Sequence, residues 1–386
     1  MSNRLHALHA IGQSLWLDYI DRTMLANGDL ERRIREDALT GMTSNPTIFE
    51  KALAEGSAYD AQLATVAAVT SDRDAFEVVA STDVRNACDK FRGVYDATNG
   101  VDGYVSLEVA PDLALDAQRT VAEARKLWAL VDRPNLMIKV PGTAEGAEAI
   151  RRLIADGINV NVTLLFAIDA HARVLEAFIK GLEDRVAAGK SVAKIASVAS
   201  FFVSRVDSAI DKQLESMAAN EKNEARKSNL LALRGKAAIA NAKMAYRLFT
   251  ERFSGPRWAA LERQGALKQR PLWASTSTKN PHYRDVIYVE ELAGPDTVNT
   301  LPPATLEAFR DHGDARVAVD VGIDEAERVL AQLEAHGISL TKVTDQLLRE
   351  GLASFEQSFV TLQAGLERKR ASLTAVSSSG ANVSVR

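Results

Sequence analysis

Lys139 is the residue in this chain whose type and position most clearly allow covalent chemistry. It lies near the carboxyl end of the apolar run Asn135 to Val140, directly before the loop residues Pro141 to Thr143. A lysine ammonium is costly to desolvate, so burial at a strand end favours the free amine, which can attack a ketone or aldehyde carbonyl. The alternative is a lysine that extends its ammonium from the strand end into water. Lys139 alone does not decide between the two.

Short apolar runs, separated by longer amphipathic stretches, recur along the chain and indicate how Lys139 is positioned. The eight runs of strand length are Leu15 to Tyr19, Leu39 to Thr43, Gly103 to Val109, Asn135 to Val140, Ile158 to Leu164, Ile195 to Phe202, Leu272 to Ser275 and Val298 to Leu301. Helical patterns lie between them, among them Ala144 to Ala155, Asp169 to Leu182 and Ser204 to Met217. This alternation predicts an α/β fold with a parallel sheet, and eight units favour a closed (β/α)8 TIM barrel over a doubly wound open sheet.

Several stretches predict additional helices on this barrel. Pro46 to Asn99 and Leu214 to Phe253 are longer than a simple crossover between strands. After the last strand, one helical face stays apolar through Leu348, Leu352, Phe355, Phe359 and Leu362, which predicts a long C-terminal helix packed on the barrel. We expect residues 1–370 to form a single barrel domain with helical insertions, and the Ser-rich tail 371–386 to be disordered.

The composition bounds the class of protein and its partners. With 46% apolar and 25% charged residues, the chain of 386 residues is typical of a soluble globular protein. Its net charge of -4 argues against nucleic acid or an anionic membrane as the main partner, and a local basic site for a phosphate stays compatible with it. Cys88 is the only cysteine, the start lacks the pattern of a secretory signal, and no apolar run reaches membrane-spanning length. We therefore expect a cytoplasmic protein.

The alternation of side chains along the strands gives the sharpest prediction of a site. Successive strand residues point to opposite faces, and in the fifth run the apolar Val160, Val162 and Leu164 must face the helices. The residues of opposite parity, which then point into the barrel, are Asn159, Asn161 and Thr163. The same sorting turns inward Asp18, Glu108 with Ser106, and Ser200 with Phe202. Each could singly be a satisfied buried polar group, but together, near strand ends where barrel enzymes place catalytic groups, they predict an active site.

Other motif-like patterns give no reason to expect a cofactor or a metal. Ala187 to Ser191 resembles the end of a phosphate-binding P-loop, but Asp184 occupies the position of its first glycine, and the order is helix, loop, strand. The six histidines show no spacing of zinc ligands, and surface positions explain His6 and His9. We expect neither a metal nor a cofactor.

Six segments resemble the transaldolase family, in its longer bacterial type. They are LWLDYIDR (15–22), TGMTSNPTIF (40–49), NLMIKVPGTAEG (135–146), GINVNVTLLF (157–166), SVASFFVSRVD (197–207) and LWASTSTKNP (272–281). The resemblance runs from about Leu15 to past Leu301. It implies a barrel, a Schiff-base lysine, no metal, and transfer of a dihydroxyacetone unit between sugar phosphates in the pentose phosphate pathway.

Carried over to this sequence, the resemblance implies the catalytic residues. Lys139 is then the Schiff-base lysine, and Asp18 is the acid/base that takes the C4 hydroxyl proton while the C3–C4 bond breaks. Asp21, in the same motif, is the alternative to Asp18. Glu108 and Thr163 match the pair that handles a water during carbinolamine formation and dehydration, and an ion pair with Lys139 is the alternative role of Glu108.

The resemblance also implies the substrate-binding residues. The positions that orient hydroxyl groups and the lysine are Thr43, Asn45, Asn161 and Ser200, with Phe202 as an aromatic wall. Asn45 could instead only form the turn before Pro46. Arg205, just past the sixth strand, is a bidentate donor for a phosphate, and Ser275 is its expected partner. Shorter transaldolases carry an arginine where this chain has Ser277; Lys279 either replaces that arginine or is a solvated loop charge.

The predicted function is therefore transaldolase. The donor would be sedoheptulose 7-phosphate or fructose 6-phosphate, and the acceptor glyceraldehyde 3-phosphate or erythrose 4-phosphate. One alternative is a class I aldolase, a lyase that acts on fructose 6-phosphate through the same imine. Another is a non-catalytic barrel that binds a sugar phosphate, although the inward carboxylates of Asp18 and Glu108 would make such binding costly. The sequence leaves a monomer and a homodimer equally open.

Overall fold

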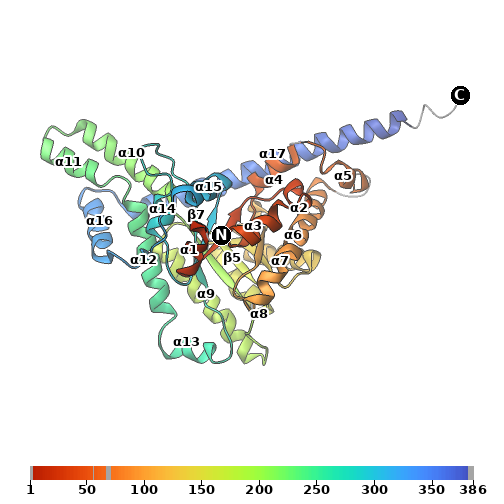
Figure 1. Cartoon of the computed structure of the whole chain (residues 1–386), viewed down its shortest axis with the longest axis horizontal. Coiled ribbons are helices and arrows are strands. Elements are labelled where there is room, and N and C mark those ends of the chain that lie inside the picture. The colour runs from red at the N-terminus through yellow and green to blue at the C-terminus, as the bar shows by residue number, and fades with distance from the viewer. Residues whose placement is uncertain (1–2, 55, 67–70, 381–386) are drawn as a thin grey trace.

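Eight parallel strands form a closed barrel in the computed structural model, which describes residues 3–54, 56–66 and 71–380. Each strand pairs with its neighbours in chain order, and β1 pairs with β8 to close the barrel (Figure 1). The strands are β1 (Gln13–Asp18), β2 (Leu39–Thr43), β3 (Tyr104–Glu108), β4 (Leu136–Pro141), β5 (Val160–Leu165), β6 (Ser197–Phe202), β7 (Arg270–Ala274) and β8 (Thr297–Leu301). The predicted (β/α)8 barrel is confirmed, and the open doubly wound sheet is wrong.

Polar residues start several strands earlier than the apolar runs predict. Gln13 opens β1, and its side-chain amide donates to the Leu292 carbonyl at 3.0 Å and to Thr297 Oγ1 at 3.1 Å. Arg270 opens β7 and donates to Ser14 Oγ at 2.7 Å. These bonds give the Gln13 amide nitrogen and the Arg270 guanidinium partners inside the protein, so that polar residues can continue a buried strand at the amino-terminal end of the barrel.

Asn159 belongs to the same end of the barrel and not to the predicted site. It directly precedes β5, and its Nδ2 donates to the carbonyl oxygens of Pro134 and Leu136, each at 2.9 Å. Its Oδ1 accepts from the Ala196 N–H at 2.9 Å. Asn159 therefore ties the start of β5 to the segments that lead into β4 and β6, which explains a buried amide without a catalytic role.

Helices surround the barrel and fill the two long stretches predicted to hold extra helices. The first six are α1 (Arg4–Ala10), α2 (Arg22–Ala26), α3 (Asp29–Glu36), α4 (Pro46–Ala54), α5 (Asp60–Val66) and α6 (Asp72–Ala97). A 3-10 turn (Pro111–Leu113) precedes α7 (Ala117–Val131), α8 (Ala144–Asp156), α9 (Ile168–Ala187), α10 (Ser204–Asn220), α11 (Glu224–Ala232) and α12 (Ala237–Arg252). The last are α13 (Gly255–Glu262), α14 (Ile287–Glu291), α15 (Pro303–His312), α16 (Ile323–Ala335) and α17 (Leu340–Gly380).

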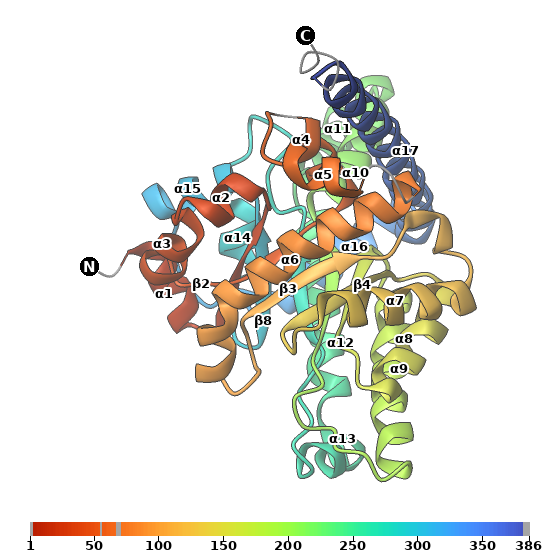
Figure 2. The same ribbon diagram turned by 90° about the vertical axis from the view of Figure 1, so that its right-hand side faces the viewer.

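The predicted C-terminal helix is α17, which packs against α4, α5, α6 and α10 and projects beyond the barrel at its far end (Figures 1 and 2). Its apolar face buries Phe355, Phe359 and Leu362. The helix continues to Gly380, although disorder is predicted from Ala371 onward. Extending a helix costs far less than nucleating one, which explains how this weakly apolar stretch continues α17. Residues 381–386 lie outside the described residues, and the division into one domain and a disordered tail stays a prediction.

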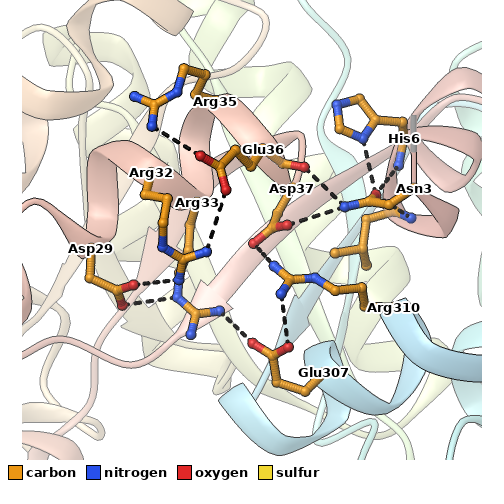
Figure 3. A network of polar contacts seen from close by, with 11 residues as sticks. Asn3, His6, Asp29, Arg32, Arg33, Arg35, Glu36, Asp37, Glu307 and Arg310 are labelled. Carbon is orange, nitrogen blue, oxygen red and sulfur yellow. Dashed lines mark hydrogen bonds and ion pairs between the residues drawn. The ribbon is translucent and has the colours of Figure 1, made fainter. Parts of the chain in front are cut away.

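A polar network joins Asn3, at the start of α1, to the end of α3 and to α15, next to the β1–β8 pair that closes the barrel (Figure 3). Asn3 caps α1 by accepting from the Leu5 N–H at 3.0 Å, and its Nδ2 donates to the Glu36 carbonyl at 2.9 Å and to Asp37 Oδ1 at 3.2 Å. Asp37 is buried and forms an ion pair with Arg310 of α15. The network thus holds α1, α3 and α15 together beside the β1–β8 pair.

His171 of α9 should make the fold sensitive to acid. It is fully buried beside the Phe201 ring, with centroids 5.7 Å apart, and neither ring nitrogen has a hydrogen-bond partner among the described residues. Burial lowers the pKa of His171 from 6.5 to about 3. The unfolded chain therefore takes up a proton more readily than the folded one. The part of the folding stability that depends on neutral His171 is fully present above pH 6.5 and is lost as the pH falls from there toward about 3.

We expect His171→Leu to lose less stability on acidification than the wild type does. Between about pH 7.5 and about pH 5.5, the wild type should lose about 1.4 kcal/mol more unfolding free energy than the variant. Urea unfolding at both pH values measures the difference, and His282→Gln, at an exposed loop histidine, is the matched control. Equal losses in wild type and His171→Leu would contradict the prediction.

Candidate active site

A cavity of about 150 Å³ opens at the carboxyl ends of the strands. Its lining residues are Asp18, Thr43, Asn45, Lys139, Thr163, Ser200, Phe202, Arg205, Ala274, Ser275, Ser277, Lys279, Thr300, Pro302 and Phe355. Every predicted site residue except Glu108 and Asn161 is among them. Glu108 contacts Lys139, and Asn161 contacts Ser200, so the structure brings the whole predicted set together.

Lys139 lies in β4 with its amine inside the barrel and only 5% of the residue exposed. Its Nζ donates to the Ser44 carbonyl at 3.1 Å and lies 3.3 Å from Glu108 Oε2. The Phe355 ring covers the amine, with 5.9 Å between Nζ and the ring centroid. The alternative of a lysine that reaches into water therefore does not fit the structure, whereas the predicted ion pair with Glu108 is present.

Asp18 and Asp21, the two candidates for the acid/base, have different surroundings. Asp18 ends β1, lines the cavity and accepts from Thr43 Oγ1 at 2.7 Å. Burial raises the pKa of Asp18, while the charge of Lys139 and the Thr43 hydroxyl oppose that rise. Asp21 instead caps α2, where its Oδ1 accepts from the Met24 N–H at 2.8 Å. Only Asp18 can therefore face a ligand in the cavity.

Glu108 and Thr163 present unsatisfied polar atoms close to the amine. Burial raises the pKa of Glu108; Lys139 opposes that rise and the charge of Asp18 adds to it. Apart from the ion pair with Lys139, Glu108 Oε2 has no hydrogen-bond partner in the described part of the chain, and neither has Thr163 Oγ1. Buried polar atoms without partners mark places where a water or a ligand atom binds. The pair is thus placed to hold such a molecule.

Asn161 belongs to a row of hydrogen bonds that crosses the barrel interior at the level of the amine. It is paired in register with Lys139 on the neighbouring strand. Ser200 Oγ of β6 donates to Asn161 Oδ1 at 2.7 Å, and Asn161 Nδ2 donates to Ser106 Oγ of β3 at 3.0 Å. Both ends of the amide are therefore fixed, which gives a rigid polar wall beside Lys139.

Arg205 and Ser275 line the same cavity. Arg205 lies in the first turn of α10, where helix N–H groups and the helix dipole favour an anion, and no ion-pair partner is within 4.0 Å among the described residues. Burial lowers the pKa of Arg205, which Glu350 opposes. Ser275 has a φ of 56°, and its backbone carbonyl oxygen accepts from the Ser204 N–H at 3.0 Å. A serine held in this left-handed conformation is typical of a functional site.

Comparison with known proteins places the chain in a family. The family model described as "Transaldolase/Fructose-6-phosphate aldolase" matches residues 15–366. The chain belongs to this family. Three relatives named "Transaldolase" are those of Trichodesmium erythraeum (45% identical, 97% of this chain and 100% of the relative), Frankia alni (49%, 93% and 95%) and Thermobifida fusca (49%, 94% and 97%). The resemblance seen in the six sequence segments is thereby confirmed.

Asn45 and Lys279, each predicted with an alternative role, both line the cavity. Asn45 lines the cavity and also caps α4, because its Oδ1 accepts from the Ile48 N–H at 3.0 Å. Lys279 lines the cavity, is exposed, and donates to Ser277 Oγ at 3.0 Å. Ser277 and Lys279 line the same cavity as Arg205, so the choice between them stays open.

Four cavity residues were not predicted, Ala274, Thr300, Pro302 and Phe355, and two of them contact predicted site residues. Phe355 comes from α17; its apolar periodicity predicts that the helix packs on the barrel, but not which ring reaches the cavity. Thr300, the last residue but one of β8, shares a hydrogen bond of 2.6 Å with Thr43 Oγ1. Its place near a strand end is the same signal that identified Asp18, so parity could have found it.

The described residues contain no group of three or more His, Cys, Asp or Glu side chains arranged to hold a metal ion. None of their helices combines the length and the apolar character needed to cross a membrane. That the reaction needs neither a metal nor a cofactor stays a prediction.

Proposed function

We propose that this chain is a transaldolase, a transferase that moves a dihydroxyacetone unit from a ketose phosphate to an aldose phosphate through a Schiff base on Lys139. The observation that carries the proposal is the buried Lys139 amine, 3.3 Å from Glu108 Oε2, in one cavity with Asp18 and Arg205. The names of the relatives support the same reaction. We also propose a cytoplasmic location and a monomer or homodimer.

Formation of the imine is the first task of the site. The free amine of Lys139 attacks the C2 carbonyl of the ketose and gives a carbinolamine, which must lose its hydroxyl as water. The departing hydroxyl needs a proton, and burial favours the protonated form of Glu108. Glu108 and Thr163 have free polar atoms beside the amine, so they can supply that proton and hold the water.

Cleavage of the C3–C4 bond is the second task. Asp18 takes the proton of the C4 hydroxyl, the C3–C4 electrons move to the protonated imine, and the shortened aldose phosphate leaves. The three-carbon enamine stays on Lys139 until its C3 attacks the aldehyde of the acceptor, whose oxygen regains a proton from Asp18. Water then hydrolyses the imine and releases the new ketose phosphate. The Thr43 hydroxyl orients Asp18 for both proton transfers.

The phosphate is proposed to bind at Arg205, Ser275 and the first turn of α10, with Ser277 or Lys279 completing the site. Donors would be sedoheptulose 7-phosphate and fructose 6-phosphate, and acceptors glyceraldehyde 3-phosphate and erythrose 4-phosphate. All of them carry a phosphate at the end remote from the reacting carbon. One anion site can therefore serve donor and acceptor in turn.

A class I aldolase that releases the three-carbon unit to water is the second candidate, because the family description includes fructose-6-phosphate aldolase. The rings of Phe202 and Phe355 in the cavity wall limit access of water and so favour transfer. The test mixes fructose 6-phosphate with erythrose 4-phosphate and compares sedoheptulose 7-phosphate formation with dihydroxyacetone release in the absence of acceptor. Release as fast as transfer would support the aldolase instead.

Arg205→Ala should weaken the use of sugar phosphates and leave unphosphorylated sugars almost unaffected. Loss of a charge-assisted interaction of about 1.5 to 3 kcal/mol lowers kcat/KM for fructose 6-phosphate by about tenfold to more than a hundredfold. The measurement compares fructose 6-phosphate with fructose in wild type and variant. Lys212→Ala, at an exposed cation on the same helix, is the control. An equal loss with both donors would show that Arg205 does not hold the phosphate.

A further inference from the structure

The anion end of the cavity is built from two separate elements whose relative position must be fixed. Arg205 comes from the first turn of α10, whereas Ser275, Ser277 and Lys279 come from the loop 275–286 between β7 and α14. A phosphate can contact both only if the loop stays against the helix. The inference below rests on the proposed anion site and concerns how that site is held together.

Two buried carboxylates on one face of α10 face the far end of this loop. Asp207 Oδ2 accepts from the Tyr288 hydroxyl at 2.8 Å, and its Oδ1 accepts from the Ala238 N–H at 2.7 Å. One turn later, Asp211 Oδ2 accepts from the Tyr283 hydroxyl at 2.6 Å. Burying carboxylates is costly, and burial raises the pKa of Asp207 to about 7. The contacts of these two carboxylates must therefore offset the cost of burying them.

The second carboxylate repeats the bonding pattern of the first. Asp211 Oδ1 accepts from the Gly235 N–H at 3.0 Å, just before α12. Each carboxylate thus accepts one backbone N–H from residues at or just before the start of α12 and one tyrosine hydroxyl, from Tyr283 in the loop or from Tyr288 in α14. The Tyr283 ring also packs over Gly235, where an added Cβ would lie 2.8 Å from Tyr283 Cζ. Packing of the ring against Gly235 and the hydrogen bond of the hydroxyl to Asp211 therefore both fix the position of Tyr283.

The loop is tethered at both ends of the run that holds the anion-binding residues. At its start, the Ser275 carbonyl accepts from the Ser204 N–H of α10 at 3.0 Å, and Thr276 Oγ1 donates to Asn299 Oδ1 at 2.9 Å. After Lys279, the Tyr283 hydroxyl donates to Asp211. Between these points, the hydrogen bonds of the described residues are local to the loop, such as Lys279 Nζ to Ser277 Oγ at 3.0 Å. Tyr283 therefore returns the loop to α10, while the next residues, Arg284 and Asp285, bond His312 of α15.

We propose that the pairs Asp211–Tyr283 and Asp207–Tyr288 are positioning residues that hold the loop 275–286 against α10, so that Arg205 and the loop meet the same phosphate. None of the four lines the cavity, so they act through the residues that do. Breaking the Asp211–Tyr283 hydrogen bond should weaken phosphate binding and leave the reaction steps at Lys139 unchanged. That separation distinguishes positioning from a general contribution to folding.

Tyr283→Phe tests the proposal, because it removes one hydroxyl and keeps the ring on Gly235. KM for fructose 6-phosphate should rise about three- to tenfold with kcat nearly unchanged, and kcat/KM for fructose should stay at the wild-type value. The dissociation constant of inorganic phosphate should rise by the same factor. Tyr246→Phe is the matched control, since its hydroxyl donates to the Pro295 carbonyl at 3.1 Å, away from the cavity.

The outcomes separate this inference from the proposed function. Phosphate that binds wild type and Arg205→Ala equally would refute the anion site itself. Phosphate binding that is lost in Arg205→Ala but unchanged in Tyr283→Phe would refute the positioning role alone, as would an equal loss with both donors. If Tyr283→Phe melts at a much lower temperature than Tyr246→Phe, then Tyr288→Phe provides the second variant, with the same expected rise in KM and the same refuting result.

Discussion

Replacing Lys139 by alanine or arginine should abolish transfer and leave the fold intact, because only a primary amine can form the imine. We expect turnover to fall by at least about a thousandfold, the scale of losing a covalent catalytic group. The measurement is transfer from fructose 6-phosphate to erythrose 4-phosphate, with circular dichroism to confirm folding. Arginine keeps the positive charge beside Glu108, so a loss of transfer activity in both variants would show that the reaction needs the amine and not only the ion pair.

Borohydride reduction with the donor present shows where the imine forms. A three-carbon adduct should appear in segment 134–151 of the wild type and be absent from both Lys139 variants. Lys243→Arg is the matched control, because Lys243 is also buried, with its Nζ donating to the Val321 carbonyl at 2.7 Å, and lies on α12 outside the cavity. An adduct on Lys279 or Lys190 would overturn the assignment of the catalytic lysine.

The eight strands could be predicted because buried parallel strands are apolar on both faces. The prediction failed mainly at the amino-terminal strand ends, where Gln13 and Arg270 each donate hydrogen bonds to partners from another strand or a loop. Sequence shows the polarity of such a residue but not its partner. For the same reason, the alternation of side chains grouped Asn159 with the inward-pointing site residues, although Asn159 bonds backbone carbonyls at the amino-terminal end of the barrel.

Much of the candidate site could be predicted because strand parity and the carboxyl-end rule bring distant residues together. Asp18 and Glu108 are the last residues of β1 and β3. Glu108 and Asn161 are paired in register with Lys139 on the two neighbouring strands, and closure of the barrel brings β1 with Asp18 to the same cavity. Phe355 reaches the cavity only through the packing of α17 across the rim, which periodicity does not specify. The pairing of Tyr283 with Asp211 likewise depends on the path of a long loop.

Asp18→Asn should lower turnover by about a hundredfold or more while the imine still forms, because Asp18 acts after imine formation. Asparagine keeps an oxygen that can accept from the Thr43 hydroxyl, so the change removes the proton acceptor and little else. Asp18 would take up the C4 proton as a carboxylate. Lys139 favours that form, since its positive charge opposes the burial that raises the pKa of Asp18.

Asp21→Asn is the control that decides between the two aspartates of the first motif. Asparagine caps helices as well as aspartate does, so this variant should keep both the α2 cap and the turnover. The decisive comparison is steady-state transfer alongside borohydride trapping in both variants. Asp18→Asn should trap the adduct at the wild-type level and transfer slowly. If it cannot be trapped, Asp18 acts before the imine, and if Asp21→Asn loses turnover instead, the acid/base is Asp21.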